Sequence, residues 1–164
     1  MANPKHLAQL NLGVADWNQW RQDNPGIKPN LSRAELNDWD LHNVDLSDAN
    51  LTGASLERTN LSGANLERAN LSFAKLIVAD LTAADLAGAT IEWADLEWAG
   101  LFVADLTGAN LTGSSLAGAG LNGAELNGTI MPDGTIWADV NEIIMPDGTW
   151  EGASISMLAY TPAS

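Results

Sequence analysis

Residues 49–68 read ANLTGASLERTNLSGANLER, and this five-residue unit governs most of the chain. An apolar residue occupies every fifth position from Leu31 to Leu126, and all of these residues are Leu except Ile91. Two positions before each of them lies a second row, in which Ala predominates. Neither row contains a gap or an insertion, so one register runs through more than half of the chain.

A five-residue spacing fits neither an α-helix nor a flat strand. On a helix each step of five residues rotates by about 140°, which would spread the leucines around the whole cylinder. In a strand an odd spacing sends successive leucines to opposite faces. The pattern suits a chain that turns a corner every five residues and returns each Leu to one interior axis, which predicts an all-β solenoid.

The units Ala49–Gly53, Ala64–Arg68 and Ala109–Gly113 resemble the A(D/N)LXX consensus of the pentapeptide-repeat family. The resemblance covers about residues 29–128 and implies a right-handed quadrilateral β-helix of about five coils. It implies that Leu and the small residue two positions before it point inward, and that the other three residues point outward. Gly at eight of the positions two after Leu favours tight corners.

An open-ended solenoid exposes core side chains and unpaired backbone, so both ends need caps. We expect residues 1–28 to form an N-terminal helical cap, with Pro4 as first helical residue and one apolar stripe running to Trp17. Trp39 should lean from the first coil against this helix. The leader, which includes Gly13-Val14 and Trp17-Asn18, also resembles that of cyanobacterial pentapeptide-repeat proteins.

After Leu126 the register fades and a different duplication appears. Ile130–Thr135 reads IMPDGT and recurs at Ile144–Thr149. Because Pro-Asp-Gly is a tight-turn sequence, residues 129–164 are expected to form turns or hairpins that cap the C-terminal end. The sequence does not decide whether the duplicated segment does more than this.

Composition narrows the functional class. The 164 residues contain no Cys, which excludes disulfide frameworks and thiol chemistry. The formal net charge of −14 disfavours direct binding to nucleic acid or to an anionic membrane. Residues 76–164 contain no Lys or Arg at all. The N-terminus lacks an export or membrane segment, so we expect a cytoplasmic protein.

A search for catalytic chemistry finds no pattern of the required kind. His6 and His42 are the only histidines, and neither belongs to a recognisable catalytic or metal-binding motif. The carboxylates between Asp38 and Asp48 follow the five-residue frame and lack the glycine and terminal glutamate of a calcium loop. We therefore predict no catalytic residues, no cofactor and no metal, and we expect a protein that is not an enzyme.

Large apolar residues gather at outward positions of coils three and four. Residues twenty apart are neighbours in adjacent coils, so Phe73 should lie beside Trp93 and Val78 beside Trp98. A contiguous apolar patch typically marks an interaction surface, although these residues could instead pack only on one another and on neighbouring corners. The predicted aromatic patch consists of Phe73, Ile77, Val78, Trp93, Trp98, Phe102 and Val103.

These features lead to two functional hypotheses. The first is a non-enzymatic structural scaffold whose rigid acidic surface binds a protein partner, or a second copy, through the aromatic patch. The alternative comes from the resemblance, since several pentapeptide-repeat proteins mimic DNA and bind type II topoisomerases such as gyrase. That alternative would use the acidic surface, here represented by Asp80, Asp85, Asp95 and Asp105. Neither the partner nor the oligomeric state follows from the sequence.

Overall fold

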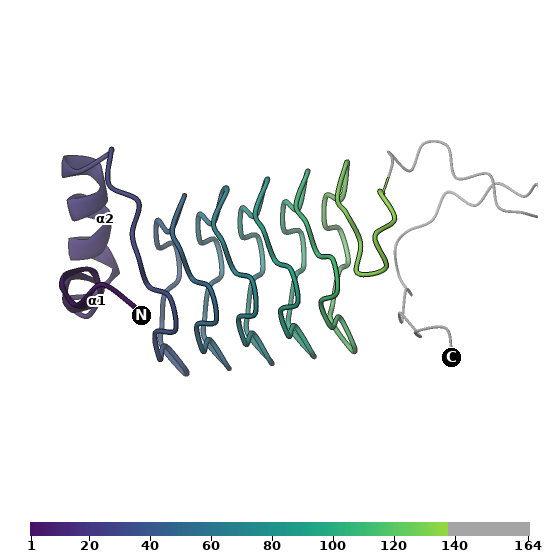
Figure 1. Ribbon diagram of the computed structural model, residues 1–164, viewed down its shortest axis with the longest axis horizontal. Helices are drawn as coiled ribbons and strands as arrows, with labels where there is room; N and C mark the ends of the chain where they lie inside the picture. The colour runs from purple at the N-terminus through teal and green to yellow at the C-terminus, as the bar shows by residue number, and fades with distance from the viewer. Residues whose placement is uncertain (138–164) are drawn as a thin grey trace, which may run out of the picture.

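The repeat winds into stacked four-sided coils behind two short helices (Figure 1). The computed structural model describes residues 1–137. Within them, parallel bridges join residues twenty positions apart, from Asn30↔Asn50 to Asn110↔Ile130. Four five-residue units therefore make one coil, and five coils begin at residues 30, 50, 70, 90 and 110. Each bridge is an isolated one, so the sides of the coil contain little extended strand, less than the expected all-β class suggests.

The interior is built as the repeat predicts. Every apolar residue of the five-residue series from Leu31 to Leu111 is at most 2% exposed. The smaller residues two positions earlier line the interior beside them, and burying each Leu contributes about 2 kcal/mol to stability. Thr59, an exception in the small-residue row, is also buried, and its hydroxyl donates to the carbonyl of Leu36 at 2.8 Å. Trp39 is half-buried and packs against the core.

Backbone hydrogen bonds hold the coils together at each unit. The N–H of Leu31 donates to the carbonyl of Asn50 at 2.8 Å, and the N–H of Asn50 donates to the carbonyl of Pro29 at 2.8 Å. Each corner closes with a turn, as from the Ala34 N–H to the Leu31 carbonyl. The second turn residue, two positions after Leu, has a positive φ at all twenty corners, twelve of which carry a residue other than Gly. Left-handed corners are therefore a rule of this fold.

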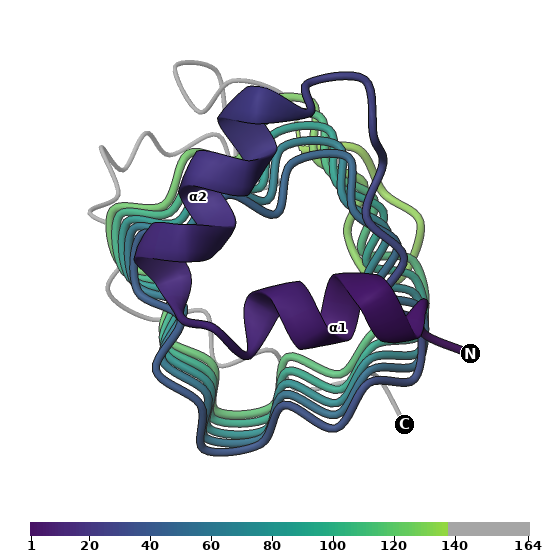
Figure 2. The ribbon, with the colours of Figure 1, turned by 90° about the vertical axis from the view of Figure 1, so that its left-hand side faces the viewer.

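The N-terminal segment differs from the single helix predicted. It forms α1 (Pro4–Leu10) and α2 (Val14–Asp23), which are separated by Gly13 with a φ of 107°. Pro4 is the first residue of α1 as expected, and Asn3 caps the helix, because its side chain accepts from the N–H of Lys5. The break lets the two helices lie across different parts of the open end of the first coil (Figure 2). A single straight helix would cover less of a four-sided opening.

The helices satisfy backbone groups that the first coil would otherwise expose. Trp17 is fully buried, and its indole N–H donates to the carbonyl of Asp45 at 2.7 Å. The side chain of Asn18 accepts from the N–H of Asp45, and the His6 ring accepts from the N–H of Asn30 at 2.9 Å. His6 therefore has a structural role in fastening the cap to the first coil.

Arg21 fastens α2 to the first coil. It is 7% exposed, and its guanidinium donates to the carbonyls of Ile27 at 2.6 Å and Ser47 at 2.9 Å. It also donates to the carboxylate of Asp45 at 3.3 Å. One buried cation thus occupies several acceptors at the end of the solenoid.

The first copy of the duplicated motif forms a hairpin against coil five. Ile130 pairs with Asn110 and, in antiparallel fashion, with Ile136. The turn between the hairpin strands is closed by hydrogen bonds between Met131 and Thr135 and between Gly134 and Met131. The second copy, residues 144–149, lies outside the described residues.

Replacing Arg21 with Met should lower the free energy of unfolding by about 3 kcal/mol, because several buried acceptors lose their donor at once. Urea unfolding measures this change. The matched control is Lys28→Met, since Lys28 is well exposed and pairs with Asp48 at the surface. The control should change stability by less than about 1 kcal/mol. Equal effects of the two substitutions would contradict the proposed role of Arg21.

Candidate interaction surface

The outward side chains are arranged in four corner columns, which we name A to D. Their second turn residues are 33, 53, 73, 93 and 113 for corner A, 38, 58, 78, 98 and 118 for corner B, 43, 63, 83, 103 and 123 for corner C, and 48, 68, 88, 108 and 128 for corner D. Sides AB, BC and CD lie between consecutive corners, and side DA closes the coil. The twenty-residue pairing fixes these columns.

The structure distributes the predicted aromatic patch over corners A, B and C of coils three and four. Six of its seven residues are exposed, and Ile77 is half-buried. The tryptophans are the most prominent members, with Trp93 at corner A 59% exposed and Trp98 at corner B 67% exposed. Corner D carries no apolar residue larger than Ala in these coils. In coils three and four the large exposed apolar side chains therefore lie at three of the four corners.

The two tryptophans rest on glycines of coil five. A Cβ built on Gly113 would lie 2.5–2.7 Å from three adjacent atoms of the Trp93 ring, and one built on Gly118 would lie 2.4–2.7 Å from the same three atoms of Trp98. Near-equal distances to neighbouring ring atoms place these points over the ring face. Each indole therefore covers a glycine with one face and takes up the same pose at its own corner.

Ring-to-ring contacts are not what orders these side chains. Phe73 and Trp93 are neighbours in one column, as predicted, yet among residues 1–137 the paired aromatic rings are those of His6 with Trp20 and Trp17 with Trp20 in the N-terminal cap. The spacing of glycines in the sequence is the signal for this arrangement. A glycine stands twenty residues after Trp93, Trp98 and Val103.

Five patch residues also occupy the left-handed region of the backbone. They are Phe73, Val78, Trp93, Trp98 and Val103, with φ between 51° and 60°. This conformation costs about 1–2 kcal/mol for a residue other than Gly and is particularly unfavourable for a β-branched side chain. In coil five all four corner positions are Gly. The patch therefore places large apolar side chains at positions where the backbone conformation favours Gly.

The aspartates singled out in the sequence do not form one stripe. Asp80 lies on side BC, Asp95 on side AB, and Asp85 and Asp105 are paired on side CD, with Glu125 next in the same column. Each of the four aspartates accepts a hydrogen bond from the backbone N–H two residues on, at 2.8–3.1 Å. This Asx contact stabilises the turn, and Asn accepts in the same way at Asn50 and Asn70.

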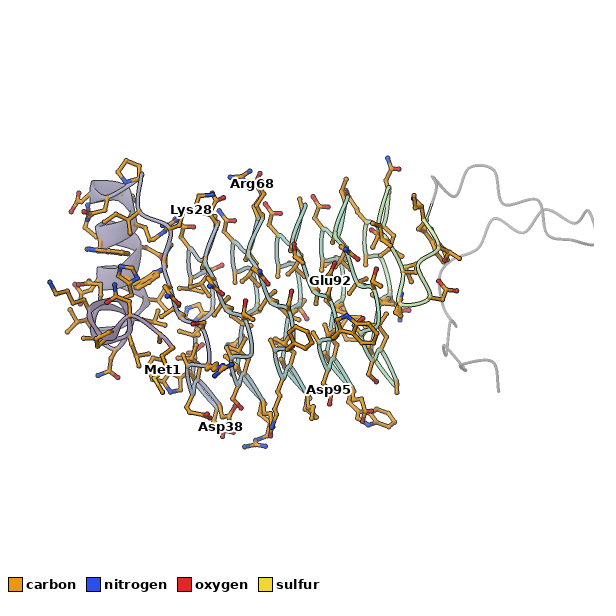
Figure 3. The ribbon with its side chains drawn as sticks, viewed as in Figure 1. Met1, Lys28, Asp38, Arg68, Glu92 and Asp95 are labelled. Atoms are coloured by element: carbon orange, nitrogen blue, oxygen red, sulfur yellow. The ribbon has the colours of Figure 1, made fainter. Side chains whose placement is uncertain are left out.

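Ion pairs concentrate in the first two coils. Arg58 donates two hydrogen bonds of 2.7 Å to Asp38 and lowers the pKa of that carboxyl. Arg68 and Lys28 lower the pKa of Asp48 in the same way, and the imidazole of His42 lowers that of Asp40. Lys28 and Arg68 lie along one edge of the prism and Asp38 near the opposite edge (Figure 3). The acids of coils four and five have no basic residue on their own coils.

Within residues 1–137, no group of three or more His, Asp or Glu side chains is arranged to hold a metal ion. His42 lies on the surface and contacts Asp40 at 2.9 Å. No helix in this part of the chain is long and apolar enough to cross a membrane.

A family model described as pentapeptide repeats matches residues 30–68, 64–100 and 104–131. The chain belongs to the pentapeptide repeat family. This assignment agrees with the register, the four units per coil and the buried Leu series described above. The right-handed β-helix implied by the resemblance is the fold of this family. Family members are generally non-enzymatic repeat proteins.

Similar solved structures include cyanobacterial pentapeptide repeat proteins. The chain is 41% identical to Rfr23 from Cyanothece 51142, with a TM-score of 0.56, over 56% of this chain and 63% of that one. It is 35% identical to HetL from Nostoc sp. strain PCC 7120, which is involved in heterocyst differentiation regulation, with a TM-score of 0.42, over 68% of this chain and 63% of HetL. The chain thus spans less than two thirds of either relative. The search of curated proteins found no match.

The seating of the Trp93 ring can be tested by adding one methyl group. Gly108 and Gly113 have nearly the same φ, but nothing lies within 4 Å of a Cβ on Gly108. Gly108→Ala should therefore cost only backbone strain, about 1 kcal/mol, whereas Gly113→Ala should cost about 1 kcal/mol more because the indole is displaced. Urea unfolding of both variants, repeated in a Trp93→Gly background, measures the difference. If the excess persists without the ring, this account of the contact is wrong.

Proposed function

We propose that this pentapeptide repeat protein is a non-enzymatic interaction module that binds a protein partner, or a second copy, through the aromatic patch. The observation that supports this is the pairing of exposure with backbone strain. Phe73, Val78, Trp93, Trp98 and Val103 remain exposed while occupying a left-handed conformation that Gly would adopt at lower cost. These residues keep an unfavourable backbone conformation although they are not buried. A contact with another molecule best explains why large side chains stand there.

The rigidity of the patch supports the same proposal. The tryptophan rings are held against coil five, so little side-chain freedom remains to be lost on binding. Tryptophan is also the residue most enriched among the dominant contacts of protein interfaces. Trp93 and Trp98 are accordingly the proposed anchors, and the remaining patch residues flank them.

The test is the double substitution Trp93→Gly and Trp98→Gly. Since Gly occupies the equivalent corners of coil five, these changes should alter the free energy of unfolding by no more than about 1 kcal/mol while removing both anchors. Quantitative cross-linking in a lysate of the source organism, with sedimentation of the purified protein, would measure partner binding and self-association. Leu12→Ser is the control, because Leu12 is exposed in the N-terminal cap, away from the patch. Loss of folding in the double variant would instead assign the rings a packing role.

DNA mimicry toward a type II topoisomerase is the second candidate. Its support is the column of Asp85, Asp105 and Glu125 on side CD, together with the lack of basic residues after Lys75. If this candidate is correct, the wild type should inhibit or modulate gyrase supercoiling at equimolar protein, with strong salt dependence. Changing Asp80, Asp85, Asp95 and Asp105 to Asn should abolish the effect while keeping the Asx acceptors. A wild type that leaves supercoiling unchanged would remove this candidate.

A further inference from the structure

The aromatic patch is not purely apolar, because carboxylates alternate with its two anchors. In coil four, Glu92 and Trp93 form corner A, Asp95 lies midway along side AB, and Glu97 and Trp98 form corner B. In Figure 3 Glu92 and Asp95 both lie on the side of the prism turned toward the viewer. Side AB therefore presents two indole rings with the carboxylates of Asp95 and Glu97 between them, and Glu92 stands just before the first ring, at the edge of side DA.

Hydrogen bonds from the protein hold all three carboxylates in place. Glu92 accepts from the side-chain amide of Asn110 at 2.7 Å, and Glu97 accepts from the hydroxyl of Ser115 at 3.2 Å. Asp95 accepts from the backbone N–H of Glu97 at 3.1 Å. Each of these contacts uses a single carboxylate oxygen. The negative charge of the side is therefore both ordered and uncompensated by ion pairing among the described residues.

The only basic side chain on side AB of coils three to five is Lys75, which lies next to Asp95 in the adjacent coil. Side AB of coil four thus carries two carboxylates, with a third from Glu92 at corner A, against one ammonium in the adjacent coil, and it keeps a negative excess. A second copy of the chain would bring the same carboxylates and a net charge of −14 to the contact. Pairing of this face with itself is therefore opposed by like charges.

We infer that side AB of coil four is a docking site for a cationic protein segment that carries arginine. A guanidinium is planar, so it stacks on the open face of an indole and also pairs with a neighbouring carboxylate. Trp93 and Trp98 supply two such faces, Asp95 and Glu97 supply acceptors between them, and Glu92 supplies one beside Trp93, at the corner with side DA. The inference rests on the proposed function and narrows it, because it specifies the chemistry of the partner.

Fluorescence anisotropy with a labelled peptide of alternating arginine and glycine tests this inference on the full-length protein. The same peptide with citrulline in place of arginine keeps the shape and removes the charge, and a lysine version keeps the charge and removes the planar group. The arginine peptide should bind at near-physiological salt, the lysine peptide more weakly, and the citrulline peptide not measurably. Equal binding of the arginine and citrulline peptides would overturn the inference.

Matched variants distinguish peptide binding at this site from attraction by the overall negative charge of the protein. Glu92→Gln, Asp95→Asn and Glu97→Gln remove two charges from side AB and one from corner A, whereas Asp85→Asn, Asp105→Asn and Glu125→Gln remove three from side CD. The first triple variant should weaken binding of the arginine peptide at least about tenfold, and the second by less than about threefold. Equal losses would mean that binding follows overall charge, which would overturn the inference.

The double tryptophan variant tests the role of the indole rings without changing the charge of the protein. Trp93→Gly with Trp98→Gly should also weaken binding of the arginine peptide about tenfold. Unchanged affinity would overturn the inference. The two proposals fail in different ways. Partner capture that depends on the tryptophans, combined with arginine binding that does not, leaves the interaction module in place and rejects the cationic partner. Partner capture that survives loss of the tryptophans rejects the interaction module itself.

Discussion

Each corner of the coil depends on one backbone conformation, the left-handed region at the second residue of the turn. It allows the chain to change direction within five residues and to return the next Leu to the interior. Because all twenty corners share it, the coils stack in register, and each corner of coils one to four bonds to the same corner of the next coil, as from the Arg33 N–H to the Thr52 carbonyl. Glycine would meet the requirement at least cost, so each larger residue at a corner reflects another demand.

The interior of this fold is predictable from sequence because a single spacing determines it. The Leu series and the small residues beside it decide which side chains are buried, and no long-range information is needed to place them. The break between α1 and α2 was not predictable in this way. Leu7, Leu10, Val14 and Trp17 have helical spacing, and only the shape of the four-sided opening explains why two helices cover it better than one.

The candidate surface was predictable in its membership but not in its construction. Counting by twenty from Phe73 and Val78 identifies Trp93 and Trp98 as their column neighbours, and the pairing of the coils agrees. Sequence spacing does not reveal which way a side chain leans. The rings lean toward coil five and rest on glycines, so the contact partner of Trp93 is Gly113 rather than Phe73.

The acidic residues of the repeat combine two roles that the sequence alone does not separate. Where an Asp stands directly before the Leu of a unit, as Asp85 does, its side-chain oxygen closes the following turn, and Asn50 does the same in its own unit. Hydrogen bonding therefore explains why a small polar acceptor stands there but not why so many positions carry a charge. Glu92 and Glu97 are different, because they precede the tryptophans at the corners and bond to side chains of coil five instead of closing a turn.

Coil five is therefore shaped by the residues of coil four. Gly113 and Gly118 satisfy the left-handed corner and also leave the space that the two indoles occupy, while Asn110 and Ser115 orient the two glutamates. A side chain at either glycine would displace a ring, and loss of either donor would free a carboxylate. The surface of coil four is thus preorganised by its neighbour, which makes the geometry of the patch a property of two adjacent coils.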